Sequence, residues 1–178
     1  QYSTYNRSLV PQLETKGIRI IDAFEELTKE QQEFVDKYFE ETVYPVLTPM
    51  AVDASRPFPL IRNKTLNIAA FLLKKGEKKK EENYEFATVQ VPGVLPRIIP
   101  IPDGVNHSFI LLEQIIEKNM ERLFLNYDVI CAYPYRIMRN ADLTIDEDEA
   151  EDLLQEIQKQ LKKRQWGEII RLEVEDKI

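Results

Sequence analysis

The 178-residue sequence contains one cysteine, one histidine and only five glycines. A single cysteine, Cys131, excludes both a disulfide framework and a zinc cluster within the chain and suits a reducing compartment. Glycine-rich loops that cradle nucleotide phosphates and the serine nucleophile elbow are absent as well. Because common active sites are built from such converging groups, we expect no catalytic, cofactor-binding or metal-binding residue in this chain.

Long apolar runs and an excess of basic residues are missing too. The longest apolar runs, such as 69–73 and 109–112, are far shorter than the roughly 20 residues that span a bilayer, so no membrane span is predicted. Acidic residues outnumber basic ones by 31 to 24, which gives a net charge of −7. This charge works against generic binding to nucleic acid or anionic membrane, and any anion site has to be local.

The residues that are present form a pattern of helices and strands. The composition, 43% hydrophobic and 31% charged, is typical of one folded domain. Helical spacing predicts a helix over 4–15 that ends at Gly17, followed by an extended link. Thr28 and Gln31 form a capping box that opens the next helix, and the prolines of 45–59 exclude helix or central strand there.

The second half of the chain predicts a hairpin, two helices and two more strands. Segments 66–73 and 84–91 alternate as hairpin strands around a charged, solvated tip. After a second proline-rich passage, Ser108 is a candidate N-cap for a helix with an apolar face. Residues 129–139 form a strand in which Pro134 indicates an edge position or a bulge. A capping box at 144–147 predicts a helix, and the last strand covers 169–174.

This order of elements predicts an α+β fold. Its most economical arrangement is a four-stranded, mostly antiparallel sheet with helices packed on one face, plus the N-terminal helix. The acidic run 146–152 lacks the spacing of a calcium loop and suits a helix N-terminus. His107 lies in a polar turn, where exposure or helix capping is the simpler interpretation.

Two groups of basic residues are candidates for an anion site or for contact with a neighbouring domain. Arg56, Arg62 and Lys64 lie in or near the first proline-rich connector, and Arg136 and Arg139 lie along the third predicted strand. Arginines a few positions apart at a strand end can clamp phosphate oxygens. They can equally pair with the many acids of this chain, and the sequence leaves both alternatives open.

Several strings of residues resemble the head, or middle, domain of bacterial polyphosphate kinase. The resemblance rests on 44–53, 56–61, 63–69, 91–92, 95–97, 109–113, 135–143 and Val174. It implies that 1–16 is the tail of an N-terminal helical domain, that 17–178 is the head domain, and that two catalytic C-terminal domains lie outside this sequence. Because the sequence begins at Gln1 without a methionine, we expect it to be part of a longer parent polypeptide.

The resemblance also implies a function for the parent protein. It would be an enzyme that transfers the terminal phosphate of ATP reversibly onto polyphosphate, with magnesium and a phosphohistidine intermediate formed in the C-terminal domains. The present segment would supply architecture and subunit contact and be inactive alone. Its partners would be its own N-terminal and C-terminal domains and a second subunit in a homo-oligomer, in the cytoplasm, with peripheral association of the parent with the inner membrane left open.

Two other hypotheses remain at this point. One is an autonomous module that binds polyphosphate or nucleotide through Arg56, Arg62, Arg136 and Arg139. The other is a free-standing scaffold with no kinase attached.

Overall fold

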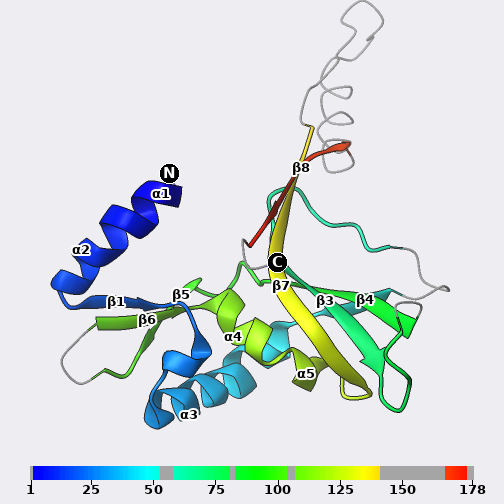
Figure 1. Cartoon of the computed structure of the whole chain (residues 1–178), viewed down its shortest axis with the longest axis horizontal. Helices are drawn as coiled ribbons and strands as arrows, with labels where there is room; N and C mark the ends of the chain where they lie inside the picture. Colours follow the sequence, from blue (N-terminus) through cyan, green and yellow to red (C-terminus); the bar gives the residue numbers. More distant parts are fainter. Residues whose placement is uncertain (1, 53–57, 81–82, 104–106, 141–166, 176–178) are drawn as a thin grey trace, which may run out of the picture.

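The computed structural model describes residues 2–52, 58–80, 83–103, 107–140 and 167–175, and within them the chain forms two β-sheets and several helices (Figure 1). The helices are α1 (Tyr2–Thr4), α2 (Val10–Thr15), α3 (Lys29–Tyr38), α4 (Leu112–Lys118) and α5 (Met120–Leu123), with π-helical turns at Tyr5–Leu9 and Phe39–Val43 and 3-10 turns at Phe24–Glu26 and Tyr44–Val46. The strands are β1 (Ile18–Ile21), β2 (Pro49–Val52), β3 (Leu66–Lys74), β4 (Tyr84–Gln90), β5 (Ile98–Ile101), β6 (His107–Leu111), β7 (Tyr127–Arg139) and β8 (Ile169–Val174).

The larger sheet has the strand order β2-β4-β3-β7-β8, and all its neighbours are antiparallel. The predicted hairpin is β3 and β4, and the predicted strands 129–139 and 169–174 are β7 and β8. Strand β7 is paired on both sides only at Tyr135 and Arg136, and Pro134 precedes the stretch that β8 covers. The missing N–H of this proline therefore breaks no ladder bond to β8, which agrees with a local edge position. The bulges lie elsewhere, beside Phe71 and beside Met138.

The smaller sheet was not predicted. Its order is β1-β6-β5, with β1 parallel and β5 antiparallel to β6. The extended link after Gly17 is β1, and the second proline-rich passage contains β5, whose Pro100 is tolerated because β5 lies at an edge. The α+β class is confirmed, but the count of four strands in one sheet is wrong, because β2 joins the larger sheet and three short strands form a second one.

Ser108 is not a helix N-cap. It lies within β6, opposite Arg19 of β1, and its hydroxyl donates a hydrogen bond to the Asp103 carboxylate. Helix α4 begins four residues later, at Leu112, where the Gln114 side chain accepts a hydrogen bond from the Leu111 N–H. The apolar run 109–111 completes a strand before the helix starts, so the helical periodicity placed the boundary too early.

The capping box at Thr28 and the helical segment before Gly17 are confirmed. The Thr28 hydroxyl accepts from the Gln31 N–H at 3.3 Å, and the Gln31 side chain accepts from the Thr28 N–H at 3.0 Å. Gly17 has a φ of 76°, the left-handed conformation that ends many helices. The helix predicted from the capping box at 144–147 and the candidate Arg56 lie outside the described residues.

The main core lies where the two sheets meet α3 and α4. Helix α4 packs against β3 and β7 of the larger sheet and against β6 of the smaller one (Figure 1). Its Leu112, Ile115 and Ile116 are fully buried, as are Val35 and Phe39 from the α3 side. The apolar face that the sequence predicted for this helix is therefore the part that joins the two sheets.

A second, smaller cluster on the larger sheet consists of Ile61, Tyr135 and Ile137, packed against Ala69. Tyr135 of β7 reaches across β3, and its hydroxyl lies 2.9 Å from the Thr88 hydroxyl of β4. Thr88 is fully buried and Tyr135 is 9% exposed. Burial raises the pKa of Tyr135, while the hydrogen bond with Thr88 acts in the opposite direction.

This pair supports a prediction of stability. Thr88→Val is expected to lower the free energy of unfolding by about 1–2 kcal/mol, because the buried Tyr135 hydroxyl loses its partner. Adding Tyr135→Phe is expected to recover most of the loss, since both polar groups are then gone. Urea unfolding of the two single variants and the double variant measures this, and a fully additive double variant would contradict it.

The same tyrosine makes the stability of the folded chain depend on pH. The raised pKa means that the folded chain keeps the Tyr135 proton where the unfolded chain begins to lose it, near pH 10. The contribution of Tyr135 to the free energy of unfolding is therefore fully present below pH 10 and is lost as the pH rises further. The difference in unfolding free energy between the parent chain and Tyr135→Phe should shrink over that range.

Candidate functional site

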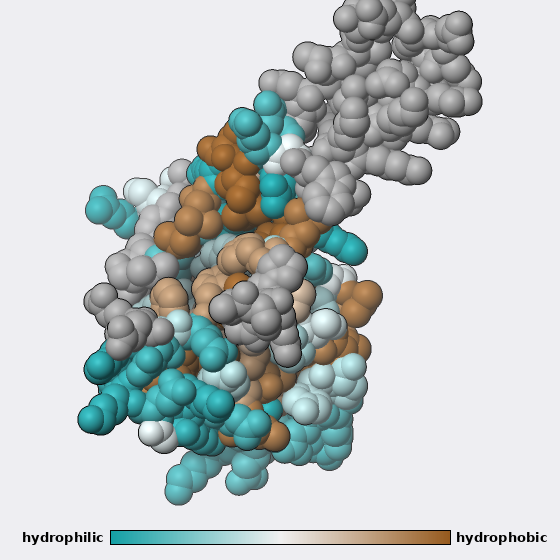
Figure 2. All heavy atoms as spheres, turned by 90° about the vertical axis from the view of Figure 1, so that its right-hand side faces the viewer, coloured by the Kyte–Doolittle hydropathy of each residue, from teal (hydrophilic) through white to brown (hydrophobic). Residues whose placement is uncertain are grey.

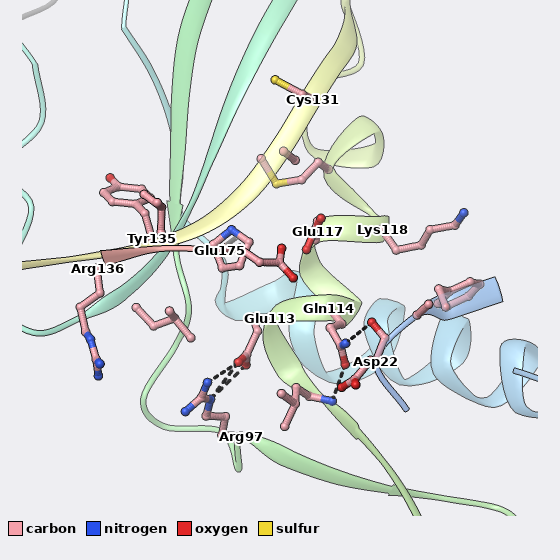
Figure 3. Close-up of a pocket in the computed structure, with 18 of the residues that line it drawn as sticks. Asp22, Arg97, Glu113, Gln114, Glu117, Lys118, Cys131, Tyr135, Arg136 and Glu175 are labelled. Atoms are coloured by element: carbon pink, nitrogen blue, oxygen red, sulfur yellow. Dashed lines mark hydrogen bonds and ion pairs between the residues drawn. The ribbon is translucent and has the colours of Figure 1, made fainter. Parts of the chain in front are cut away.

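A cleft of about 1290 Å³ lies between the N-terminal helix, α4 and the β7–β8 strands (Figure 3). One wall carries Tyr5 and Asn6, the floor carries Glu113 and Gln114 of α4, and the far wall carries Arg136 of β7. The cleft joins segments from both ends of the chain, so it exists only in the folded protein.

An ion pair on the cleft floor links α4 to the segment before β5. The Arg97 guanidinium donates to the Glu113 carboxylate from Nε at 2.9 Å and from Nη2 at 2.5 Å (Figure 3). The Glu113 side chain is 7% exposed, whereas that of Arg97 is 62% exposed. The hydrogen bond with Glu113 raises the pKa of Arg97 against the opposing effect of burial, so the Arg97 guanidinium stays charged.

Gln114 fixes a second junction beside this pair. Its side-chain amide donates to the Asp22 carbonyl, just after β1, while its oxygen accepts the Leu111 N–H (Figure 3). Both contacts are made to the backbone, so they position β1 and the start of α4 relative to each other. Glu113 and Gln114 therefore hold the cleft together from its floor.

The charge of the cleft does not favour an anion. Seven of its lining residues are aspartate or glutamate, and four are lysine or arginine. Two of those four, Arg97 and Arg136, pair with glutamates, and Lys118 lies 3.7 Å from Glu25. A polyanion would meet repulsion from the surplus carboxylates here.

Arg136 lines the cleft and is engaged by β8. Its Nε and Nη2 donate to the Glu173 carboxylate at 2.7 and 2.5 Å, and Arg171 approaches the other oxygen of Glu173 at 3.2 Å. The hydrogen bond from Arg136 lowers the pKa of Glu173, which keeps this carboxylate ionised. Arg136 thus joins neighbouring strands across the sheet.

Arg139 binds backbone groups of two other segments. Its Nε donates to the Ile61 carbonyl at 3.1 Å and its Nη1 donates to the Gly167 carbonyl at 2.8 Å. Its own N–H donates to the Asn63 side chain at 2.9 Å. The residue ties the connector before β3 to the end of β7 and to the segment before β8.

The candidate arginines do not form one described cluster. The cleft lining includes Arg136 but neither Arg62 nor Arg139, and Arg62 is exposed in the turn before β3. In that turn Lys64 has a φ of 61°, unusual for a residue with a side chain, and its N–H donates to the Ile137 carbonyl at 2.9 Å. An anion contact at Arg56, Arg62, Arg136 or Arg139 stays a prediction.

Sequence reasoning missed the pairs that organise the site. Arg97 and Glu113 are 16 residues apart, and Thr88 and Tyr135 are 47 apart, so no local spacing links them. The polar Glu113 on an otherwise buried helix face was the available signal, because a buried carboxylate requires a partner. His107 is exposed at the start of β6, where its N–H donates to the Gly17 carbonyl.

Comparison with known proteins decides the family. The family described as "Polyphosphate kinase middle domain" matches residues 30–178. This chain belongs to that polyphosphate kinase family. A polyphosphate kinase from Lactiplantibacillus plantarum is 50% identical over 98% of this chain, and one from Bacillus cereus is 48% identical over 98%.

The fold comparison agrees with this assignment. A crystal structure of polyphosphate kinase from Porphyromonas gingivalis superposes with a TM-score of 0.72 over 92% of this chain, at 24% identity. The chain covers 27% of that structure and 24–25% of the two relatives above, so it corresponds to about a quarter of those polyphosphate kinases. Within the described residues, no helix is long and apolar enough to cross a membrane.

Proposed function

We propose that this chain is a non-catalytic head domain of a polyphosphate kinase and serves architecture and subunit contact. The observation that carries the proposal is the use made of its arginines. Arg97, Arg136 and Arg139 direct their donors at the chain's own carboxylates and carbonyls. Arginines bonded to the chain's own acceptors hold its strands and helices together, whereas a phosphoryl-transfer site needs positive charge directed at the substrate.

The parent activity belongs to the same proposal. A polyphosphate kinase of full length transfers the terminal phosphate of ATP reversibly onto polyphosphate, with magnesium and a phosphohistidine intermediate in its C-terminal domains. In this arrangement the present segment contacts those domains and the N-terminal helical domain, of which 1–16 is the tail. The working compartment is the cytoplasm, which suits the single unpaired cysteine.

An activity assay tests the non-catalytic role. The purified chain of 178 residues is expected neither to hydrolyse ATP nor to make polyphosphate at any magnesium concentration, with a full-length polyphosphate kinase assayed in parallel. The reason is that Arg97, Arg136 and Arg139 are engaged within the chain and the cleft has an acidic surplus. Magnesium-dependent polyphosphate synthesis that copurifies with the chain through successive columns would overturn the proposal.

A binding titration separates architecture from an anion module. We expect the chain to show no salt-sensitive affinity for polyphosphate in the micromolar range. The matched variants are Arg62→Ala, which removes an exposed arginine, and Arg136→Ala with Arg139→Ala, which removes paired ones. Tight binding that falls steeply with salt and is lost in either variant would instead favour the anion module.

A further inference from the structure

Lys64 has an unusual backbone conformation in the turn before β3. Its φ of 61° lies in the left-handed region, and among the described residues it is the one residue other than glycine with a positive φ. This conformation is strained for a residue with a Cβ atom, and glycine or asparagine would adopt it more readily. Such strain persists only where surrounding contacts impose it, and it is concentrated at functional sites.

Hydrogen bonds from neighbouring segments impose this shape on the turn. The Lys64 N–H donates to the Ile137 carbonyl of β7 at 2.9 Å. The Thr65 hydroxyl donates to the Arg62 carbonyl at 2.9 Å, and the side-chain amide of Asn67, 2% exposed, donates to the Thr65 carbonyl at 2.9 Å. The backbone of the turn is therefore fixed, whereas Arg62 and Lys64 are exposed.

The turn lies where basic residues of the larger sheet come together. In Figure 1 the connector before β3 reaches the end of β7, and Figure 2 shows hydrophilic side chains beside hydrophobic ones at the height of β7 and β8. The cations of this basic corner are Arg62, Lys64, Arg136, Arg139 and Arg171, and its described carboxylates are Glu168, Glu173 and Glu175. Positive charge therefore exceeds negative charge here, although the cleft as a whole has an acidic surplus.

Two cations of the basic corner are free to meet a ligand. Within the part of the chain that the structure describes, neither the Arg62 guanidinium nor the Lys64 ammonium has a hydrogen-bond or ion-pair partner. Arg136 and Arg139, by contrast, bind a carboxylate and two carbonyls. Lys64 also lines the cleft. Its ammonium is a compact point charge with three donors, which suits phosphate oxygens.

We propose that Lys64, assisted by Arg62, contacts the polyphosphate chain in the full-length enzyme, away from the phosphate group that is transferred. This inference rests on the proposed function, in which the reacting groups belong to the C-terminal domains. ATP and ADP carry their few phosphates at the reacting end, whereas a polyphosphate chain is long enough to reach the head domain as well. Lys64 contributes binding, and no bond forms or breaks at it.

The contact depends on the rest of the enzyme. Two free cations are too few to give the isolated chain micromolar affinity for polyphosphate. When the reacting end of the ligand is already held by the other domains, the second contact becomes intramolecular and its effective concentration is high. Loss of Lys64 is therefore measured in the full-length enzyme.

Kinetics of the reverse reaction, which forms ATP from ADP and polyphosphate, test this contact. Lys64→Asn removes the charge and keeps the left-handed turn, because asparagine tolerates this conformation. Its KM for polyphosphate is expected to rise roughly tenfold, while kcat and the KM for ADP stay unchanged. High salt should reduce the difference, because screening weakens exposed charges. Lys64→Arg keeps the charge and is expected to restore most of the affinity.

A matched control and the length of the ligand make the result specific. Lys37→Asn is the same substitution at an exposed lysine of α3, 3.9 Å from Glu41, and is expected to leave both KM values unchanged. The effect of Lys64→Asn is expected to shrink as the polyphosphate is shortened, because a short chain does not reach the basic corner. An effect of equal size at every length contradicts the proposed contact.

Lys64→Gly separates the contact from a structural role. Glycine relieves the strained φ, so the isolated chain is expected to keep or raise its thermal midpoint. The full-length variant is expected to show the same rise in KM for polyphosphate as Lys64→Asn. A thermal midpoint that is lower by more than about 5 °C means that lysine supports the turn itself, and this result overturns the inference.

The outcomes distinguish this inference from the proposed function. An unchanged KM for polyphosphate in Lys64→Asn, or an equal rise in Lys37→Asn, overturns the contact and leaves the proposed function standing. An equal rise in the KM for ADP also overturns it, because Lys64 then acts at the reacting end. A full-length protein that forms no ATP from ADP and polyphosphate overturns both. Polyphosphate synthesis by the isolated chain overturns only the non-catalytic role.

Discussion

Phe39→Ala is expected to lower the free energy of unfolding by about 3–5 kcal/mol, the cost of truncating a fully buried aromatic side chain. Phe39 is 0% exposed and lies at the turn that follows α3. Its ring meets Tyr44 edge-to-face at 6.0 Å, and the Arg122 guanidinium lies 5.2 Å from its centre. The lost burial, the aromatic contact and the cavity all act in the same direction.

Urea unfolding followed by circular dichroism measures this effect. A loss of this size is a large part of the 5–15 kcal/mol that typically stabilises a domain, so a partly unfolded chain is a consistent result. The matched control is Phe34→Ala on the preceding helix, where the side chain is 36% exposed. The control is expected to cost about 1 kcal/mol. Equal losses in the two variants would show that Phe39 is no core anchor.

Arg97→Ala is expected to lower the free energy of unfolding by about 2–3 kcal/mol. The change leaves the Glu113 carboxylate, 7% exposed, without the two donors that hold it. Breaking a buried ion pair typically costs about 3–5 kcal/mol. Arg97 itself is mostly exposed, so water reaches part of the site and the expected loss is smaller.

Two companion variants make this result specific. Arg19→Ala removes an arginine from an exposed pair with Glu26, 2.7 Å long, and is expected to lower the free energy of unfolding by less than about 1 kcal/mol. Replacing both partners, with Arg97→Met and Glu113→Leu, is expected to recover most of the stability, because no buried charge remains. If Arg97→Ala and Arg19→Ala cost the same, Glu113 is solvated and the pair does not hold the cleft floor.

Local patterns in the sequence were sufficient for some elements. The capping box at Thr28, the β3–β4 hairpin and the last strand follow from residues close to one another in the chain, and the structure contains them. The α+β class follows from the same patterns, and the family follows from strings of residues that span the chain. Each of these inferences needs only local periodicity, turn chemistry or a resemblance.

The tertiary structure alone decided the second sheet and the use of the charged residues. Strands β1 and β5 have four residues each and both pair with β6. In the β1–β6 pair, Ile18 lies opposite His107, which is 89 positions later in the sequence. A short strand has too little periodicity of its own, and its hydrogen-bond partners come from a distant segment. The role of an arginine is likewise settled by what lies within about 3 Å of its guanidinium, as Arg139 demonstrates with two backbone carbonyls. Composition and spacing identify which groups are charged, but only the folded chain determines which of them meet.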